Sequence, residues 1–108
     1  MHGIRRAIIY IELHFREDIS LETVAAEAGY TPTYFSRLFR RVTGKSYIEM
    51  LTKYRLGYAE ALLVNGFSVA DACFSAGFGS LTSFQDAFKK KHGISPGEYK
   101  KKNRHSDD

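Results

Sequence analysis

The chain has 108 residues, enough for one domain or for two small lobes that share a connecting element. Hydrophobic residues make up 44% of it, which excludes a disordered chain, and its formal net charge of +4 suits a polyanionic partner without proving one. The sole cysteine, Cys73, excludes an intrachain disulfide and a multi-cysteine zinc site, and no apolar stretch is long enough to span a bilayer. We therefore expect a soluble, cytoplasmic protein without a membrane partner.

The first helix is expected over about residues 4–16. Only two prolines occur, and no alternating apolar pattern of strand length stands out, so the whole chain is predicted to be helical. One apolar stripe identifies this helix, formed by Ile4, Ile8, Ile11 and Phe15.

Two further helices are expected over 21–28 and 32–43. Ser20 is a natural N-cap for the first of them, and Gly29 can adopt the left-handed conformation that ends it. Pro32 suits the first position of the next helix, where its missing N–H costs nothing. Two short helices with a Gly-centred turn between them are typical of a helix-turn-helix.

A long helix is expected over 47–64, where apolar residues recur every three or four positions. They are Tyr47, Leu51, Tyr54, Tyr58 and Leu62. Gly57 costs this helix about 1 kcal/mol relative to alanine. Gly57 indicates a close contact between helices, a flexible point between the lobes, or a position where glycine is merely tolerated.

The helix-turn-helix pattern then recurs about 48 residues after its first copy. Ser68 and Ser80 are expected to cap helices over 69–76 and 81–92, and Ser95-Pro96 to begin a short last helix. Matching positions in the two copies are Gly29 and Gly77, Phe35 and Phe84, Phe39 and Phe88, and Gly44 and Gly93. The duplication argues against a chance match to a DNA-binding unit.

The expected fold is all-α, with two helix-turn-helix lobes joined by one long linker helix. Within 1–108, its parts are a first lobe over 4–45, the linker over 46–65, a second lobe over 66–100 and a frayed tail over 101–108. A linker of about 18 residues is about 27 Å long, and successive major-groove faces on one side of DNA are about 34 Å apart. One monomer could therefore seat both lobes in successive grooves.

The helix over 32–43 is expected to turn its apolar stripe inward and its polar face outward. The stripe consists of Phe35, Leu38, Phe39 and Val42. A recognition helix enters the major groove with its N-terminal half, which makes base-reading candidates of Thr33, Ser36 and Arg37. The phosphate-binding candidates are Thr31, Arg40 and Arg41. The alternative is a basic face that is merely solvated.

The helix over 81–92 is expected to turn Phe84, Ala87 and Phe88 inward. Its base-reading candidates are Leu81, Thr82, Gln85 and Asp86, and its phosphate-binding candidates are Ser80, Lys89 and Lys90. Asp86 takes the place of Arg37, and a carboxylate there repels phosphate unless it accepts from cytosine N4 or pairs with a lysine. We expect less sequence reading from this half.

At these residues the chain resembles the DNA-binding domain of the AraC/XylS family of bacterial transcription regulators. The resemblance covers nearly all of residues 19–100. It is strongest at Ala76-Gly77-Phe78, Ser83-Phe84, Ala87-Phe88-Lys89-Lys90, Gly93, Ser95-Pro96 and Tyr99. The first copy matches through Val24-Ala25, Gly29-Tyr30, Tyr34-Phe35, Arg37, Phe39 and Gly44, and the long helix through Arg55, Ala59 and Leu62-Leu63.

The resemblance implies a seven-helix, two-lobed fold that spans two grooves of an asymmetric site in double-stranded DNA. It also implies regulation of transcription at the bacterial nucleoid, usually activation, often with contact to RNA polymerase. No cofactor is implied. The domain is expected to be a monomer of a parent that can dimerise. The chain is either a stand-alone activator or the C-terminal module of a longer regulator, and the helix starting near Met1 favours the latter.

Two other functions are the alternatives to DNA binding. An enzyme is not expected, because the four histidines are scattered without metal-ligand spacing and no Gly-rich phosphate loop occurs. His92 lies at a helix end, where a histidine is usually solvated or favoured by the dipole. The more serious rival is protein docking by the same fold, through an exposed patch that could include Tyr30, Tyr34, Tyr47 and Phe74.

Overall fold

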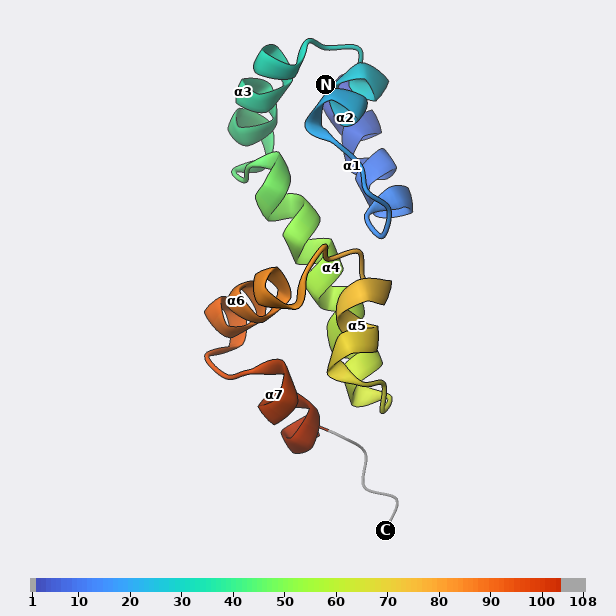
Figure 1. Cartoon of the computed structure of the whole chain (residues 1–108). Helices are drawn as coiled ribbons and strands as arrows, with labels where there is room; N and C mark the ends of the chain where they lie inside the picture. The colour runs from blue at the N-terminus through green and yellow to red at the C-terminus, as the bar shows by residue number, and fades with distance from the viewer. Residues whose placement is uncertain (1, 104–108) are drawn as a thin grey trace. The chain divides into compact units, whose positions relative to one another are not determined.

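The computed structural model describes residues 2–103, and Figure 1 shows them as helices joined by short turns. This part of the chain contains seven helices and no strand, which confirms the all-α fold. In chain order they are α1 (His2–His14), α2 (Leu21–Ala28), α3 (Pro32–Thr43), α4 (Tyr47–Val64), α5 (Val69–Ser75), α6 (Leu81–His92) and α7 (Pro96–Asn103).

The helix boundaries agree closely with the sequence prediction. α2, α3, α4 and α6 begin and end at the predicted residues, whereas α1 lies two positions earlier and α5 ends at Ser75 rather than residue 76. α7 continues to Asn103, so the prediction of a frayed tail from residue 101 is wrong for 101–103. Residues 104–108 of that predicted tail lie outside the described residues.

Both helix-turn-helix units are built with the same local chemistry. The Oγ atoms of Ser20 and Ser68 each accept a backbone N–H from three residues further on, at 3.1 and 3.0 Å. Gly29 (φ 83°) and Gly77 (φ 102°) follow the two capped helices in the left-handed conformation, which a side chain disfavours. The serine N-caps therefore determine where α2 and α5 begin, and the left-handed glycines determine where the chain turns after them.

Two capping boxes that the sequence reading missed start α4 and α7. The Ser46 N–H donates to Glu49 Oε1 at 2.7 Å, and the Glu49 N–H donates to Ser46 Oγ at 3.1 Å. Ser95 and Glu98 exchange the same two hydrogen bonds at 3.4 and 3.1 Å. The backbone N–H of Ser46, with Arg40 nearby, lowers the pKa of the Glu49 carboxyl group despite its partial desolvation. α3 and α6 are thus each followed by a helix whose start is capped.

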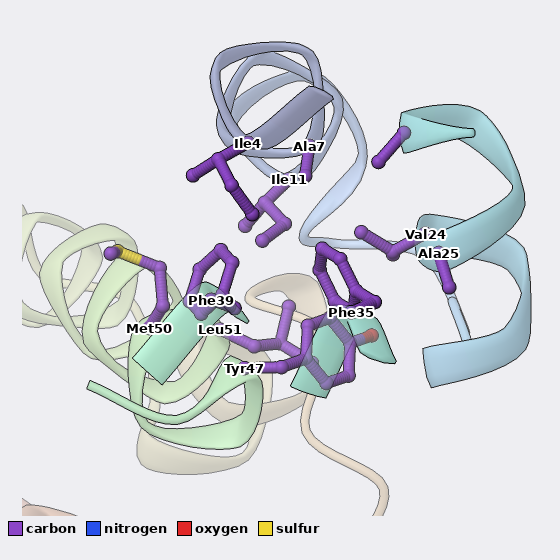
Figure 2. Packing of buried hydrophobic residues seen from close by; sticks show 11 residues of the cluster. Ile4, Ala7, Ile11, Val24, Ala25, Phe35, Phe39, Tyr47, Met50 and Leu51 are labelled. Carbon is purple, nitrogen blue, oxygen red and sulfur yellow. The ribbon is translucent and has the colours of Figure 1, made fainter. Parts of the chain in front are cut away.

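The chain divides into two compact units, the first ending at Tyr54 and the second beginning at Arg55. Figure 2 shows the core of the first unit, where Phe35 and Phe39 of α3 lie among side chains from α1, α2 and α4. The buried members of this core are Ile4, Ala7, Ile11, Val24, Ala25, Ala28, Phe35, Phe39, Tyr47, Met50 and Leu51. The Tyr47 hydroxyl is satisfied by donating to the Ile19 carbonyl at 2.9 Å.

The second unit has a core of its own, centred on Phe84 and Phe88 of α6. Its buried members are Leu56, Ala59, Leu63, Ala72, Cys73, Ala76, Phe78, Phe84 and Phe88. The predicted stripe along α4 is confirmed, since Tyr47 and Leu51 are buried and Tyr54, Tyr58 and Leu62 are half-buried against one of the two cores. It missed the buried residues of the second half, which are Leu56, Ala59 and Leu63. α4 supplies residues to two separate cores, so one stripe does not include all of its buried residues.

Removal of a buried α3 ring should destabilise the first unit strongly. Phe39 is fully buried, and Phe39→Ala is expected to lower the free energy of unfolding by about 3–5 kcal/mol. The substitution loses the favourable transfer of the ring out of water and leaves a cavity in the core. Urea unfolding followed by circular dichroism measures this cost. Leu13→Ala is the matched control, because Leu13 is 72% exposed and its loss should change stability by less than about 0.5 kcal/mol. Equal midpoints for the two variants would contradict the assigned core.

Cys73 offers a chemical probe of the second unit. It is fully buried, burial raises the pKa of its thiol, and its Sγ lies 3.4 Å from the Ser80 carbonyl oxygen. We expect alkylation at neutral pH to require local opening, and Phe88→Ala to accelerate it by about two orders of magnitude or more. Phe74→Ala, at a half-exposed position of α5, should leave the rate nearly unchanged. Rapid alkylation of the unmodified chain would be incompatible with this packing.

Candidate nucleic-acid interface

One side of α3 enters the core and the other carries its polar side chains. Phe35 and Phe39 are fully buried, and their ring centroids are 5.3 Å apart. The exposed residues include all the α3 candidates, namely Thr33, Ser36, Arg37, Arg40 and Arg41. Ser36, Arg37 and Arg40 follow Thr33 at the spacings that place residues on one helix face. The structure therefore confirms the outward face predicted for this helix.

Val42 departs from the apolar stripe predicted for α3. Its side chain is 39% exposed, and it lies at a shallow apolar groove of about 270 Å³ lined also by Ile4, Arg5, Ile8 and Ile9. Leu38 is only half-buried. The buried core ends before the last turn of α3, so the assignment of Val42 to the core is wrong.

The positive charge of α3 is not neutralised within its own helix, which holds three arginines and no acidic residue. The Arg40 Nη1 lies 4.0 Å from Glu49 Oε1, but both side chains are more than half exposed, where such a pair contributes little. No ion pair joins Arg37 to another residue within 2–103. This face can approach an anion without first breaking a strong internal contact.

An open groove of about 470 Å³ lies between the start of α2 and the first half of α3. Its lining residues are Leu21, Glu22, Pro32, Thr33, Ser36 and Arg37. All three base-reading candidates of the first unit therefore line one groove. Glu22 is the member that the sequence reading missed, although its place two residues after the N-cap Ser20 is visible in the sequence.

α6 repeats the arrangement with different outer residues. Phe84 and Phe88 are fully buried, with their ring centroids 5.6 Å apart. The predicted outer residues are all exposed, namely Leu81, Thr82, Gln85, Asp86, Lys89 and Lys90. No ion pair joins Asp86 to a lysine in the described part of the chain, so pairing with a lysine does not account for its charge.

Lys91 and His92, by contrast, turn away from this polar face. Lys91 Nζ and His92 Nε2 both contact Glu60 Oε2 of α4, at 2.7 and 2.8 Å. The His92 ring also packs against the rings of Phe88 and Tyr99 in tilted arrangements, with centroid separations of 4.3 and 4.8 Å. The alternative of a solvated His92 is therefore wrong, since its side chain is only 20% exposed, whereas its place in the last turn of α6 is the one to which the other alternative, favour by the helix dipole, applies.

Thr31 and Ser80, two phosphate-binding candidates, serve as N-caps of α3 and α6. The Thr31 Oγ1 accepts from the Tyr34 N–H at 3.4 Å, and the Ser80 Oγ accepts from the Ser83 N–H at 3.1 Å. Thr31 is exposed and Ser80 is half-buried. Both hydroxyl groups lie at a helix N-terminus, where backbone N–H groups and the helix dipole favour an anion.

Residues 2–103 hold no group of three or more His, Cys, Asp or Glu side chains that could bind a metal ion. None of their helices combines the length and the apolar character required to cross a membrane. Of the aromatic residues considered for protein docking, Tyr47 is buried and Tyr30 is half-buried, whereas Tyr34 and Phe74 are exposed.

Comparison with known proteins decides the family of this pair of helix-turn-helix units. A family model described as a helix-turn-helix domain matches residues 24–102. The C-terminal domain of AraT, a response regulator from Geobacillus stearothermophilus, is 34% identical, with a TM-score of 0.91 over 99% of this chain and 90% of that one. The chain belongs to the AraC/XylS family. It is a helix-turn-helix domain of the kind found in the transcription regulators of that family.

Two further relatives extend the likeness within the AraC/XylS family. The DNA-binding domain of the global transcriptional factor AdpA, solved in complex with a target DNA, is 27% identical with a TM-score of 0.87 over 94% of this chain and 93% of that one. The right origin-binding protein of Escherichia coli K12 is 33% identical over 99 residues, covering 91% of this chain and 34% of that protein. The chain spans between 32% and 58% of the length of the first curated relatives that it matches.

Proposed function

We propose that this domain binds double-stranded DNA sequence-specifically and so regulates transcription. The observation that carries the proposal is the outer face of α3, where three arginines without an acidic neighbour on the helix lie opposite two fully buried phenylalanines. That amphipathic arrangement keeps donors directed at solvent on a rigid helix. The DNA complex of the AdpA domain, a structural neighbour of the whole fold, supports the same partner class.

In the first unit, Thr33, Ser36 and Arg37 would read base edges from the N-terminal half of α3. The Arg37 guanidinium is exposed and can donate two parallel hydrogen bonds to guanine O6 and N7. Arg40 and Arg41 follow one turn later and would bind phosphates, together with the Thr31 hydroxyl at the helix start. Phosphate contacts fix the register, and the base contacts then supply the sequence preference.

In the second unit, Leu81, Thr82, Gln85 and Asp86 would face the bases from α6. Leu81 can contact a thymine methyl group, and Gln85 can pair with adenine N6 and N7. Lys89 and Lys90, with Ser80, would bind phosphates. Because Asp86 places a carboxylate near the polyanion, we expect this unit to contribute more backbone contact and less sequence reading than α3.

We further propose that both units of one monomer occupy successive major grooves of an asymmetric promoter site. The 18 residues of α4 correspond to about 27 Å of helix, of the same order as the separation of about 34 Å between groove faces. Activation, contact with RNA polymerase, dimerisation of a longer parent and residence at the nucleoid belong to this proposal as properties of a whole regulator. Docking to a protein is not proposed, since no observation favours it.

Selection from random duplexes, followed by salt titration of the enriched sequence, tests DNA binding. Four basic phosphate contacts, from Arg40, Arg41, Lys89 and Lys90, would give a slope of about −3.6 for log affinity against log salt. Enrichment of a non-repeating motif would support one asymmetric site per monomer. Absence of any enriched sequence, or a slope near zero, would reject DNA reading in favour of another partner.

Arg37→Ala and Lys89→Ala should separate base reading from phosphate binding. Loss of Arg37 should relax the preference at one base pair by about 1–3 kcal/mol, because its bidentate contact to guanine is removed. Loss of Lys89 should weaken all duplexes by a similar factor and make the salt slope shallower by about 0.9. Competition binding on matched and single-mismatch duplexes measures both effects. An equal loss on every duplex for Arg37→Ala would exclude its role in base reading.

A further inference from the structure

Glu22 occupies an unexpected place beside the residues that would read bases. Its carboxylate belongs to α2, yet it lines the same groove as Thr33, Ser36 and Arg37 of α3. Glu22 is exposed, and the groove is open, with a volume of about 470 Å³. An acceptor-only group therefore lies among the hydroxyl and guanidinium donors of the first unit.

Local structure gives this carboxylate one role, because an acid in the first turn of α2 suits the positive end of the helix dipole, but it gives the carboxylate no side-chain partner. The N-cap of α2 is already served by Ser20, whose Oγ accepts the Thr23 N–H at 3.1 Å and lies 2.9 Å from Thr23 Oγ1. No hydrogen bond or ion pair joins the Glu22 carboxylate to another residue within the described range 2–103. In particular, Arg37 does not neutralise it although both line one groove.

The duplicated unit carries the acid of its first turn one position later, at Asp71. Ser68 caps α5 as Ser20 caps α2, with an Oγ to N–H distance of 3.0 Å, and the residue two positions after it is Ala70 rather than a glutamate. α5 therefore keeps a first-turn acid without a carboxylate at the position that corresponds to Glu22. Both units share an acidic first turn, whereas a carboxylate that lines the groove is a property of the first unit.

A carboxylate on a DNA-facing groove is unfavourable near phosphates, so its presence is best matched by a donor on the DNA. In the major groove the donors are the amino groups of cytosine (N4) and adenine, and glutamate characteristically accepts from the former. Arg37 offers the complementary chemistry to guanine O6 and N7. The groove therefore combines one group suited to each base of G·C pairs.

We propose that Glu22 is a specificity-determining residue that accepts a hydrogen bond from cytosine N4, at or next to the base pair read by Arg37. The inference rests on the proposed DNA-binding function and deepens it. Glu22 would select by two effects that act together. It attracts cytosine through the amino group, and it penalises duplexes in which carbonyl oxygens or ring nitrogens face the carboxylate.

The test compares the unmodified domain with Glu22→Gln in the random-duplex selection and in competition binding. Glu27→Gln is the matched control, because Glu27 is also an exposed acid of α2 but lines a different groove, with Arg6, Ile9, Tyr10 and Leu13. Thermal melting establishes that all three proteins are folded. Both substitutions remove one negative charge, so any general gain in affinity for DNA should appear in both.

The expected result is loss of a cytosine preference of about tenfold or more at one position for Glu22→Gln alone. Binding to duplexes lacking that cytosine should be unchanged or tighter. The inference is overturned if Glu22→Gln tightens every duplex by the same factor as Glu27→Gln and leaves the selected motif intact. If the unmodified domain enriches no sequence at all, the proposed function itself fails, which is a different outcome from an intact motif.

Discussion

Burial of two phenylalanine rings one turn apart fixes how each recognition helix is rotated. Phe35 and Phe39 of α3, and Phe84 and Phe88 of α6, are fully buried at centroid separations of 5.3 and 5.6 Å. Rotation of either helix about its axis would expose both rings, at about 1.5–3 kcal/mol each. The side opposite the rings is therefore held outward. The polar face of each helix is a consequence of the core beneath it.

The two units share one structural framework but have different outer surfaces, because separate residues form the framework and the surface. Serine N-caps, the left-handed glycines and the paired phenylalanines recur in both units. The outward positions recur only in part: Thr33 corresponds to Thr82, but Arg37 of α3 is replaced by Asp86 on α6, and Glu22 of α2 by Ala70 on α5. Duplication therefore preserves the placement of the reading helices while leaving their chemistry free to differ.

Sequence reasoning succeeded where a residue acts on its immediate neighbours. Ser20, Gly29, Thr31 and Gly44 set the limits of α2 and α3 through hydrogen bonds or backbone conformation within a few residues, so those limits were predictable. Tertiary effects were not predictable in the same way. The change of buried positions along α4 after Tyr54 depends on which core each half of the helix joins.

The candidate site shows the same division between local and tertiary information. The exposed candidates on α3 and α6 follow from helical periodicity, since the helix limits and the inward rings were both readable. The contact of His92 with Glu60 joins residues 32 positions apart, and the groove that contains Glu22 exists only once α2 and α3 pack together. Neither could be obtained from spacing along one helix.

Charge is distributed unequally between the outer faces of α3 and α6. This asymmetry bears on how the two faces would divide phosphate binding and base reading. Along α3 the formal charge is +3, whereas on α6 Lys91 is held by Glu60, and Asp86 offsets one of Lys89 and Lys90 to leave +1. Counterion release scales with the number of phosphates neutralised. Each unit nevertheless offers two basic phosphate-binding candidates, Arg40 and Arg41 on α3 and Lys89 and Lys90 on α6, so both would contribute to the salt-sensitive affinity. The additional charge of α3 belongs to Arg37, so the asymmetry would bear mainly on base reading.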